Sequence, residues 1–150
     1  NLIIFGGIHE EGRYSNDIYK VSLLNWNWNL CLPTHDEGIT LPCPRLGHSF
    51  TLSSNNAVYV FGGLSNEGFN VPDSIPRYLN DLYKLSLLED GGYHWSLPVT
   101  TGQCPSPRES HSAVIYNYRG RETLIIYGGM CGHRLGDIHF LDTGILSNST

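Results

Sequence analysis

Three times along the chain, an apolar run of four residues ends in a pair of glycines, and a loop then leads to a segment that starts with aspartate. The pairs are Gly6 and Gly7, Gly62 and Gly63, and Gly128 and Gly129, and the aspartates are Asp17, Asp81 and Asp137. Self-similarity at a long period is the signature of a repeat architecture, and it constrains the fold more than any single residue does. The chain is therefore predicted to be an array of one repeating β-unit.

Each unit is expected to contain four strands. The first follows a Pro-Arg pair, over residues 44–52 and 107–115, and carries a histidine three residues after the arginine. These residues are Arg45 and His48 in one unit and Arg108 and His111 in the next. The apolar run is the second strand, and the third starts at the aspartate and alternates apolar and polar residues, which is typical of a strand. The fourth carries the tryptophans Trp28 and Trp95.

The spacing of these landmarks varies at one place in the unit. The interval from the arginine to the first glycine is 17 or 20 residues, and that from the aspartate to the next arginine is 28 or 27 residues. The interval from the second glycine to the aspartate is 10, 18 or 8 residues. Insertions in repeat proteins collect on one face, which is often the binding face. The loop between the second and third strands is thus the predicted interaction surface.

Composition excludes several classes of protein. The net charge of -5 argues against a nucleic-acid-binding surface, which needs a basic face. The cysteines Cys31, Cys43, Cys104 and Cys131 form no C-x-x-C pair, so we expect reduced thiols in an intracellular protein and no zinc site. No apolar run is long enough for a membrane span. We expect neither a metal nor a cofactor.

Four-stranded sheets that repeat every 50–65 residues, each with a glycine pair and a tryptophan, form the blades of a β-propeller. The predicted fold is all-β, with about three four-stranded antiparallel blades. Residues 1–33 are expected to hold the last three strands of one blade, residues 34–99 a complete blade, and residues 100–150 the first three strands of another. The propeller is expected to continue on both sides.

The chain resembles the kelch β-propellers, and most closely the N-terminal kelch domain of the host cell factor family. The segments that carry this resemblance are 14–17, 43–50, 75–83, 107–111, 127–130 and 134–137. The resemblance implies a non-enzymatic scaffold of transcription and chromatin in the nucleus, and also in the cytoplasm. It implies that transcription factors bind through short acidic-His-x-Tyr peptides, and that chromatin-modifying complexes are further partners. It implies no direct contact with nucleic acid or membranes.

Three arginines, Arg13, Arg77 and Arg134, lie in the variable loops, three or four residues before the aspartates. Tyr14 and Tyr78 follow two of them. One interpretation is a basic rim, edged by tyrosines, that receives an acidic peptide, because the guanidinium group matches a carboxylate. The alternative is that each arginine pairs with its own local aspartate, and the two can coexist.

The remaining candidate residues favour structural roles. His48, His111, Arg45 and Arg108 recur in register, which is typical of residues that support the fold, although the two histidines would suit a propeller copper oxidase. We expect no catalytic residue. A kelch substrate adaptor of a ubiquitin ligase is the alternative among binding proteins.

Overall fold

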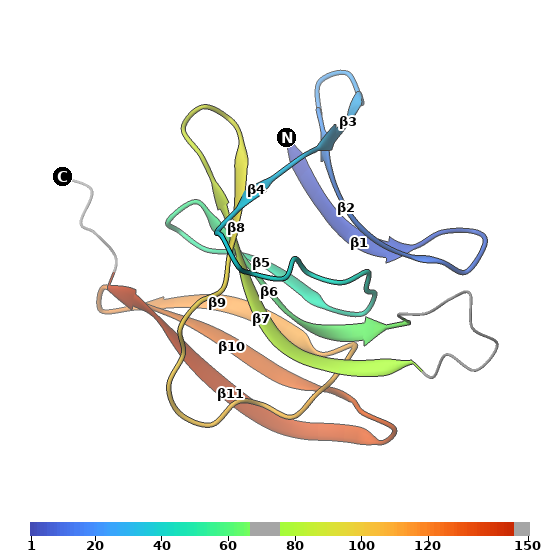
Figure 1. Cartoon of the computed structure of the whole chain (residues 1–150). Helices are drawn as coiled ribbons and strands as arrows, with labels where there is room; N and C mark the ends of the chain where they lie inside the picture. Colours follow the sequence, from blue (N-terminus) through green and yellow to red (C-terminus); the bar gives the residue numbers. More distant parts are fainter. Residues whose placement is uncertain (67–75, 146–150) are drawn as a thin grey trace.

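The computed structural model describes residues 1–66 and 76–145, and each regular element in these ranges is a β-strand (Figure 1). The strands form three sheets that lie side by side (Figure 1). The first sheet consists of β1 (Leu2–Ile8), β2 (Tyr14–Val21) and β3 (Trp28–Cys31), in that order. No helix that could cross a membrane occurs among the described residues. The all-β propeller arc predicted from the sequence is confirmed.

The second and third sheets follow the same strand order. The second sheet runs β5 (Ser49–Leu52), β6 (Ala57–Ser65), β7 (Arg77–Leu87), β8 (Tyr93–Ser96) and β4 (Thr34–His35). The third runs β9 (Ser112–Tyr118), β10 (Arg121–Met130) and β11 (Arg134–Ile145). All neighbours are antiparallel except β4, which adds to β8 in parallel and was not expected from the sequence. This short strand holds the connection between the first two sheets against the outer edge of the second.

The same pairing register recurs in all three sheets. Gly7 pairs with Ser15, and the equivalent glycines, Gly63 and Gly129, pair with Leu79 and Leu135. In every case a β-bulge lies immediately before this pair. The three strand pairs are thus geometrically equivalent units, although the loops that join them differ in length.

The core lies between successive sheets and is organised by β6. This strand is buried on both faces, and its sequence before the glycine pair is accordingly a continuous apolar run. Val58 and Val60 pack towards the first sheet, and Tyr59 and Phe61 pack towards the third. Because alternate side chains of a strand point to opposite faces, one strand supplies both interfaces.

The inner strands begin later than the sequence suggested. We expected them to start at Pro44 and Pro107, whereas β5 begins at Ser49 and β9 at Ser112. In between, Leu46 and Glu109 form isolated bridges to their own sheets, whereas the backbones of Arg45 and Arg108 bind the preceding sheet. We call residues 44–47 and 107–110 the clasp segments, and they position the hairpins described next.

Candidate protein-binding rim

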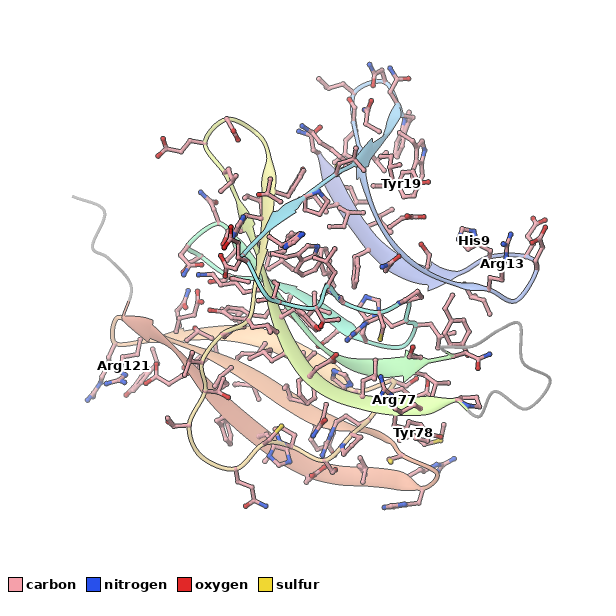
Figure 2. The ribbon with its side chains drawn as sticks, viewed as in Figure 1. His9, Arg13, Tyr19, Arg77, Tyr78 and Arg121 are labelled. Carbon is pink, nitrogen blue, oxygen red and sulfur yellow. The ribbon has the colours of Figure 1, made fainter. Side chains whose placement is uncertain are left out.

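The predicted binding residues lie at the hairpins that join β1 to β2, β6 to β7 and β10 to β11. Tyr14 pairs with Ile8, Tyr78 with Leu64 and Arg134 with Met130, so these three positions are equivalent in register. Arg13 and Arg77 each precede a tyrosine and lie one residue nearer to the hairpin tip. We define the rim as Arg13, Tyr14, Arg77, Tyr78 and Arg134, all of which lie at this end of their sheets. Figure 2 shows Arg13, Arg77 and Tyr78 towards one side of the molecule and Arg121 at the opposite side.

The three rim arginines are exposed, and the two tyrosines are half-buried. The sequence placed all three arginines in loops, but Arg77 and Arg134 are the first residues of β7 and β11. Only Arg13 precedes its strand, in a turn that the backbone of His9 closes by donating to the carbonyl of Arg13 at 2.8 Å. The expected long loop falls mainly on residues 67–75, which lie outside the described residues.

The aspartates that were candidate partners of the rim arginines are held by other residues. Arg45 donates to both carboxylate oxygens of Asp81, at 2.7 and 2.8 Å. Arg108 makes the same two bonds to Asp137. Asp17 accepts a hydrogen bond of 3.0 Å from the hydroxyl of Ser15. Arg45, Arg108 and Ser15 are thus the residues that bind these aspartates.

Arg45 joins the first two sheets. Its backbone nitrogen donates to the carbonyl of Ser15 at 3.0 Å, and its carbonyl accepts from Gly7 at 2.8 Å, so its main chain binds the first sheet. Its side chain is fully buried and reaches Asp81 and the carbonyl of Gly62, both in the second sheet. Burial alone would lower the pKa of Arg45, but the hydrogen bonds and the charge of Asp81, together with Cys43, outweigh burial and raise that pKa.

Arg108 repeats this arrangement one sheet further on. Its carbonyl accepts from Gly63 at 2.8 Å and its nitrogen donates to Leu79 at 2.9 Å, while its buried side chain binds Asp137 and the carbonyl of Gly128. The Arg108 guanidinium, followed by the ring of His139, lowers the pKa of Asp137. The two clasp segments therefore join each sheet to the next. They also fix the spacing of the rim hairpins, which belong to these sheets.

The first glycine of the first two pairs gives the clasp segment room to pass. Gly6 and Gly62 have φ angles of 67° and 62°, in the left-handed region that favours glycine. A Cβ atom on Gly6 would lie 2.8 Å from the carbonyl oxygen of Arg45, and one on Gly62 would lie 2.7 Å from that of Arg108. The glycine pair is thus needed both for the backbone turn and for the close approach of the next sheet.

The recurrent histidines lie at the same interfaces. The ring of His48 packs edge-on against Phe5 at 5.1 Å, and that of His111 against Phe61 at 5.4 Å. Burial, helped by the adjacent clasp arginine, lowers the pKa of each histidine to about 4. His111 Nε2 lies 2.9 Å from the hydroxyl of Ser49, a contact between sheets that residue spacing could not reveal. Neutral rings at packed interfaces fit a structural role.

The two tryptophans of the fourth strands occupy equivalent positions with different exposure. Trp95 pairs with Leu85, Trp28 pairs with Val21, and each packs edge-on against a tyrosine of its own sheet. Trp95 is 2% exposed because it also packs against Phe5 of the first sheet at 5.3 Å. Trp28 is 60% exposed. Only Trp95 wedges between two sheets of this chain.

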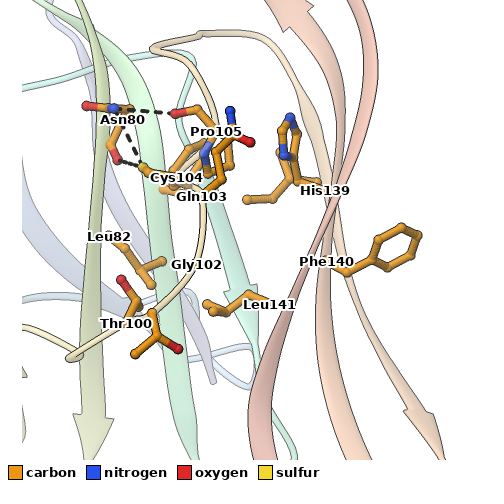
Figure 3. A pocket seen from close by; sticks show the side chains of 13 residues that line it. Asn80, Leu82, Thr100, Gly102, Gln103, Cys104, Pro105, His139, Phe140 and Leu141 are labelled. Carbon is orange, nitrogen blue, oxygen red and sulfur yellow. Dashed lines mark hydrogen bonds between the residues drawn. The ribbon is translucent and has the colours of Figure 1, made fainter.

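A cavity lies at the matching place between the second and third sheets (Figure 3). Its wall includes Phe61, His139 and Leu141, which correspond in register to the residues around Trp95. Cys104 and Pro105 close it on one side through hydrogen bonds with Asn80 (Figure 3). The cavity is a packing position of the repeat, and it offers no cluster of reactive groups.

Chemically reactive groups are dispersed over the described residues. No group of three His, Cys, Asp or Glu side chains in residues 1–66 and 76–145 could hold a metal ion. The four cysteines are not joined in disulfides. The most heavily bonded buried carboxylate, Glu122, accepts from Ser53 and Ser54 of the second sheet and so connects two sheets. The accessible feature that repeats across the sheets is the rim.

Comparison with known proteins identifies relatives over the whole length. A family model described as "Host cell factor, Kelch-repeats domain" matches residues 1–150. Host cell factor 2 of Homo sapiens is 47% identical over 149 residues, which cover 97% of this chain and 19% of that protein. Host cell factor of Drosophila melanogaster is 42% identical over 149 residues, covering 95% of this chain and 10% of that protein. The chain thus spans a fifth or less of the length of these relatives.

Proposed function

This chain belongs to the host cell factor kelch-repeat family, and from that premise we propose that it serves a nuclear transcriptional co-regulator and chromatin scaffold as its peptide-binding module. Kelch modules of this family are protein-interaction units. The partner class proposed here is a short acidic-His-x-Tyr peptide of a transcription factor, bound along the rim. The proposed location is the nucleus, and also the cytoplasm.

One observation supports this proposal most strongly: an arginine lies at the same end of each of the three sheets, and the clasp segments fix the spacing of these sheets. Arg13, Arg77 and Arg134 are all exposed there. Guanidinium groups bind carboxylates through paired hydrogen bonds, and tyrosine supplies flat contact area at small entropic cost. An extended acidic peptide could therefore meet charged and aromatic groups along the row without ordering the site first.

Fixed spacing distinguishes this rim from scattered surface arginines. The buried ion pairs of Arg45 and Arg108 join each sheet to the next, so rim residues on neighbouring hairpins are held relative to one another. A preformed site avoids much of the ordering cost that weakens binding by flexible surfaces. The proposal assigns no reaction to the chain.

The test is a binding measurement with the full chain and a fluorescein-labelled peptide of sequence Gly-Ser-Glu-His-Ala-Tyr-Gly-Ser. An exposed ion pair contributes roughly 0.2–1 kcal/mol, so a variant with Arg13→Ala, Arg77→Ala and Arg134→Ala should bind this peptide, which has one glutamate, about fivefold more weakly. Arg121→Ala is the matched control, because this exposed arginine lies at the opposite side of the molecule (Figure 2). Equal binding by the triple variant and the wild type would reject the rim as the peptide site.

A further inference from the structure

We propose that the rim arginines are not equivalent, and that the acidic residue of the peptide docks on Arg134, at the hairpin between β10 and β11, whereas Glu11 blocks Arg13. This inference rests on the proposed function and specifies which part of the rim receives the carboxylate. It comes from comparing the two rim hairpins whose tips are completely described, residues 8–14 and 130–134.

The hairpin between β1 and β2 already contains its own carboxylate. Glu11 accepts a hydrogen bond from Arg13 Nη2 at 2.6 Å, and the side chains are 73% and 64% exposed. Glu10 is adjacent in sequence, and all three residues line one open hollow with His9 and Tyr14. An acidic peptide would have to displace Glu11 and approach two carboxylates. Glu11 therefore competes with the peptide carboxylate for Arg13.

The hairpin between β10 and β11 carries no acidic side chain at its tip. Its sequence between Met130 and Arg134 is Cys-Gly-His, and both His133 and Arg134 are exposed. In the described part of the chain, no carboxylate forms an ion pair with Arg134. A tight turn, in which Cys131 donates to the carbonyl of His133 at 3.0 Å, fixes the tip.

The acidic residues nearest to this hairpin along the fold are occupied or turned away. Asp137 is bound by Arg108 through both carboxylate oxygens. Glu109, whose backbone bonds to Met130 in both directions at 2.9 Å, is 8% exposed, and its side chain lies over Gly47. Neither carboxylate competes for the exposed face of Arg134.

Formal charge separates the two tips further. Residues 8–14 contain two glutamates and one arginine, which gives a formal charge of -1, and residues 130–134 contain one arginine, which gives +1, with histidine counted as neutral. Charges within a Debye length of about 8 Å act on a ligand at physiological salt. The acidic end of a peptide is therefore attracted to the third sheet and repelled by the first.

The test is a double-mutant cycle with the full chain and two labelled peptides, Gly-Ser-Glu-His-Ala-Tyr-Gly-Ser and its counterpart with Gln in place of Glu. Arg134→Ala should weaken binding of the acidic peptide about fivefold, as expected for an exposed ion pair, and should leave the Gln peptide nearly unchanged. Arg13→Ala should change neither by more than about twofold, and Glu11→Gln should strengthen binding of the acidic peptide about two- to fivefold.

Two results overturn the inference, and they distinguish its failure alone from failure of the proposed function as well. If the acidic peptide binds but couples to Arg13 and not to Arg134, the docking assignment is wrong while the rim remains the site. If the wild-type chain binds neither peptide, both proposals fail. Thermal unfolding monitored by circular dichroism establishes that each variant remains folded, and loss of the coupling in 0.5 M salt is expected for a screened pair.

Discussion

The guanidinium of Arg45 donates to both carboxylate oxygens of Asp81 while the backbone of the same arginine is bound to the preceding sheet. One residue thus belongs to two sheets at once, and Arg108 repeats the relationship with Asp137. The rim depends on these pairs indirectly, because they determine where each hairpin stands relative to the next.

Arg45→Ala is expected to destabilise the chain by roughly 3–5 kcal/mol, because it removes a buried partner and leaves Asp81 and the Gly62 carbonyl without their donor. Urea unfolding of the full chain measures the loss. Arg121→Ala, which breaks an exposed pair with Asp142, is the control and should cost less than about 0.5 kcal/mol. Similar losses for the two variants would contradict the clasp role.

Gly62→Ala tests the close approach of the sheets. The added methyl would meet the carbonyl oxygen of Arg108 at 2.7 Å, in addition to the strain of a φ of 62°. Gly132→Ala is a control for strain alone, because its φ is 71° and nothing lies within 4 Å of the added atom. We expect about 1–2 kcal/mol for Gly132→Ala and clearly more for Gly62→Ala, measured by urea unfolding. Equal losses would remove the steric argument.

The tryptophans allow one substitution to be compared at two equivalent positions. Trp95→Ala is expected to cost roughly 3–5 kcal/mol, because the side chain is buried between two sheets. Trp28→Ala should cost much less, since its ring is mostly exposed. Calorimetry on both variants provides the comparison. A larger effect for Trp28→Ala would show that burial in this chain does not determine the contribution of the position.

Acid should destabilise the chain through the buried histidines. Burial lowers the pKa of His48 and His111 to about 4, against 6.5 in the unfolded chain. Between these values the unfolded state binds more protons, so stability falls as the pH drops from 6.5 towards 4. The loss from pH 7 to pH 5 should be about 1–2 kcal/mol per histidine once partial exposure is allowed for.

Urea midpoints at pH 7 and pH 5 measure this dependence, and the double variant His48→Gln, His111→Gln serves as the comparison. The variant should show a much smaller difference between the two pH values than the wild type. At pH 5 a glutamate with its ordinary pKa of 4.5 is still mainly ionised, so carboxylates contribute little to the difference. An unchanged pH dependence in the variant would assign the effect to other groups.

The fold could be predicted from the sequence because its determinants are local and repeated. The apolar run before Gly62, the glycine pair and the alternation after Asp81 each correspond to strands with the same register in every sheet. Alternation of apolar and polar residues with a period of two indicates a strand, and its recurrence along the chain indicates an array of repeats. The late start of β5 was missed because the backbone of Arg45 bonds to the preceding sheet, which periodicity does not record.

The partners of individual side chains were less predictable. The sequence did not reveal that Arg45 binds Asp81, which lies 36 residues further along the chain. The Arg13–Glu11 pair was not anticipated, although both residues were visible in one loop. The contact of His111 with Ser49 depends on how two sheets stack. Such contacts follow from tertiary packing, which residue spacing does not encode.

The clasps also determine where repeats could be exchanged between related proteins. Each clasp arginine binds an aspartate downstream through its side chain, whereas its hydrogen bonds to the preceding sheet join main-chain atoms. A recombination junction placed just before Pro44 or Pro107 would keep each arginine and its aspartate from the same parent. A junction between Arg45 and Asp81 would separate the pair, so viable chimeras should carry residues 44–106 as one cassette.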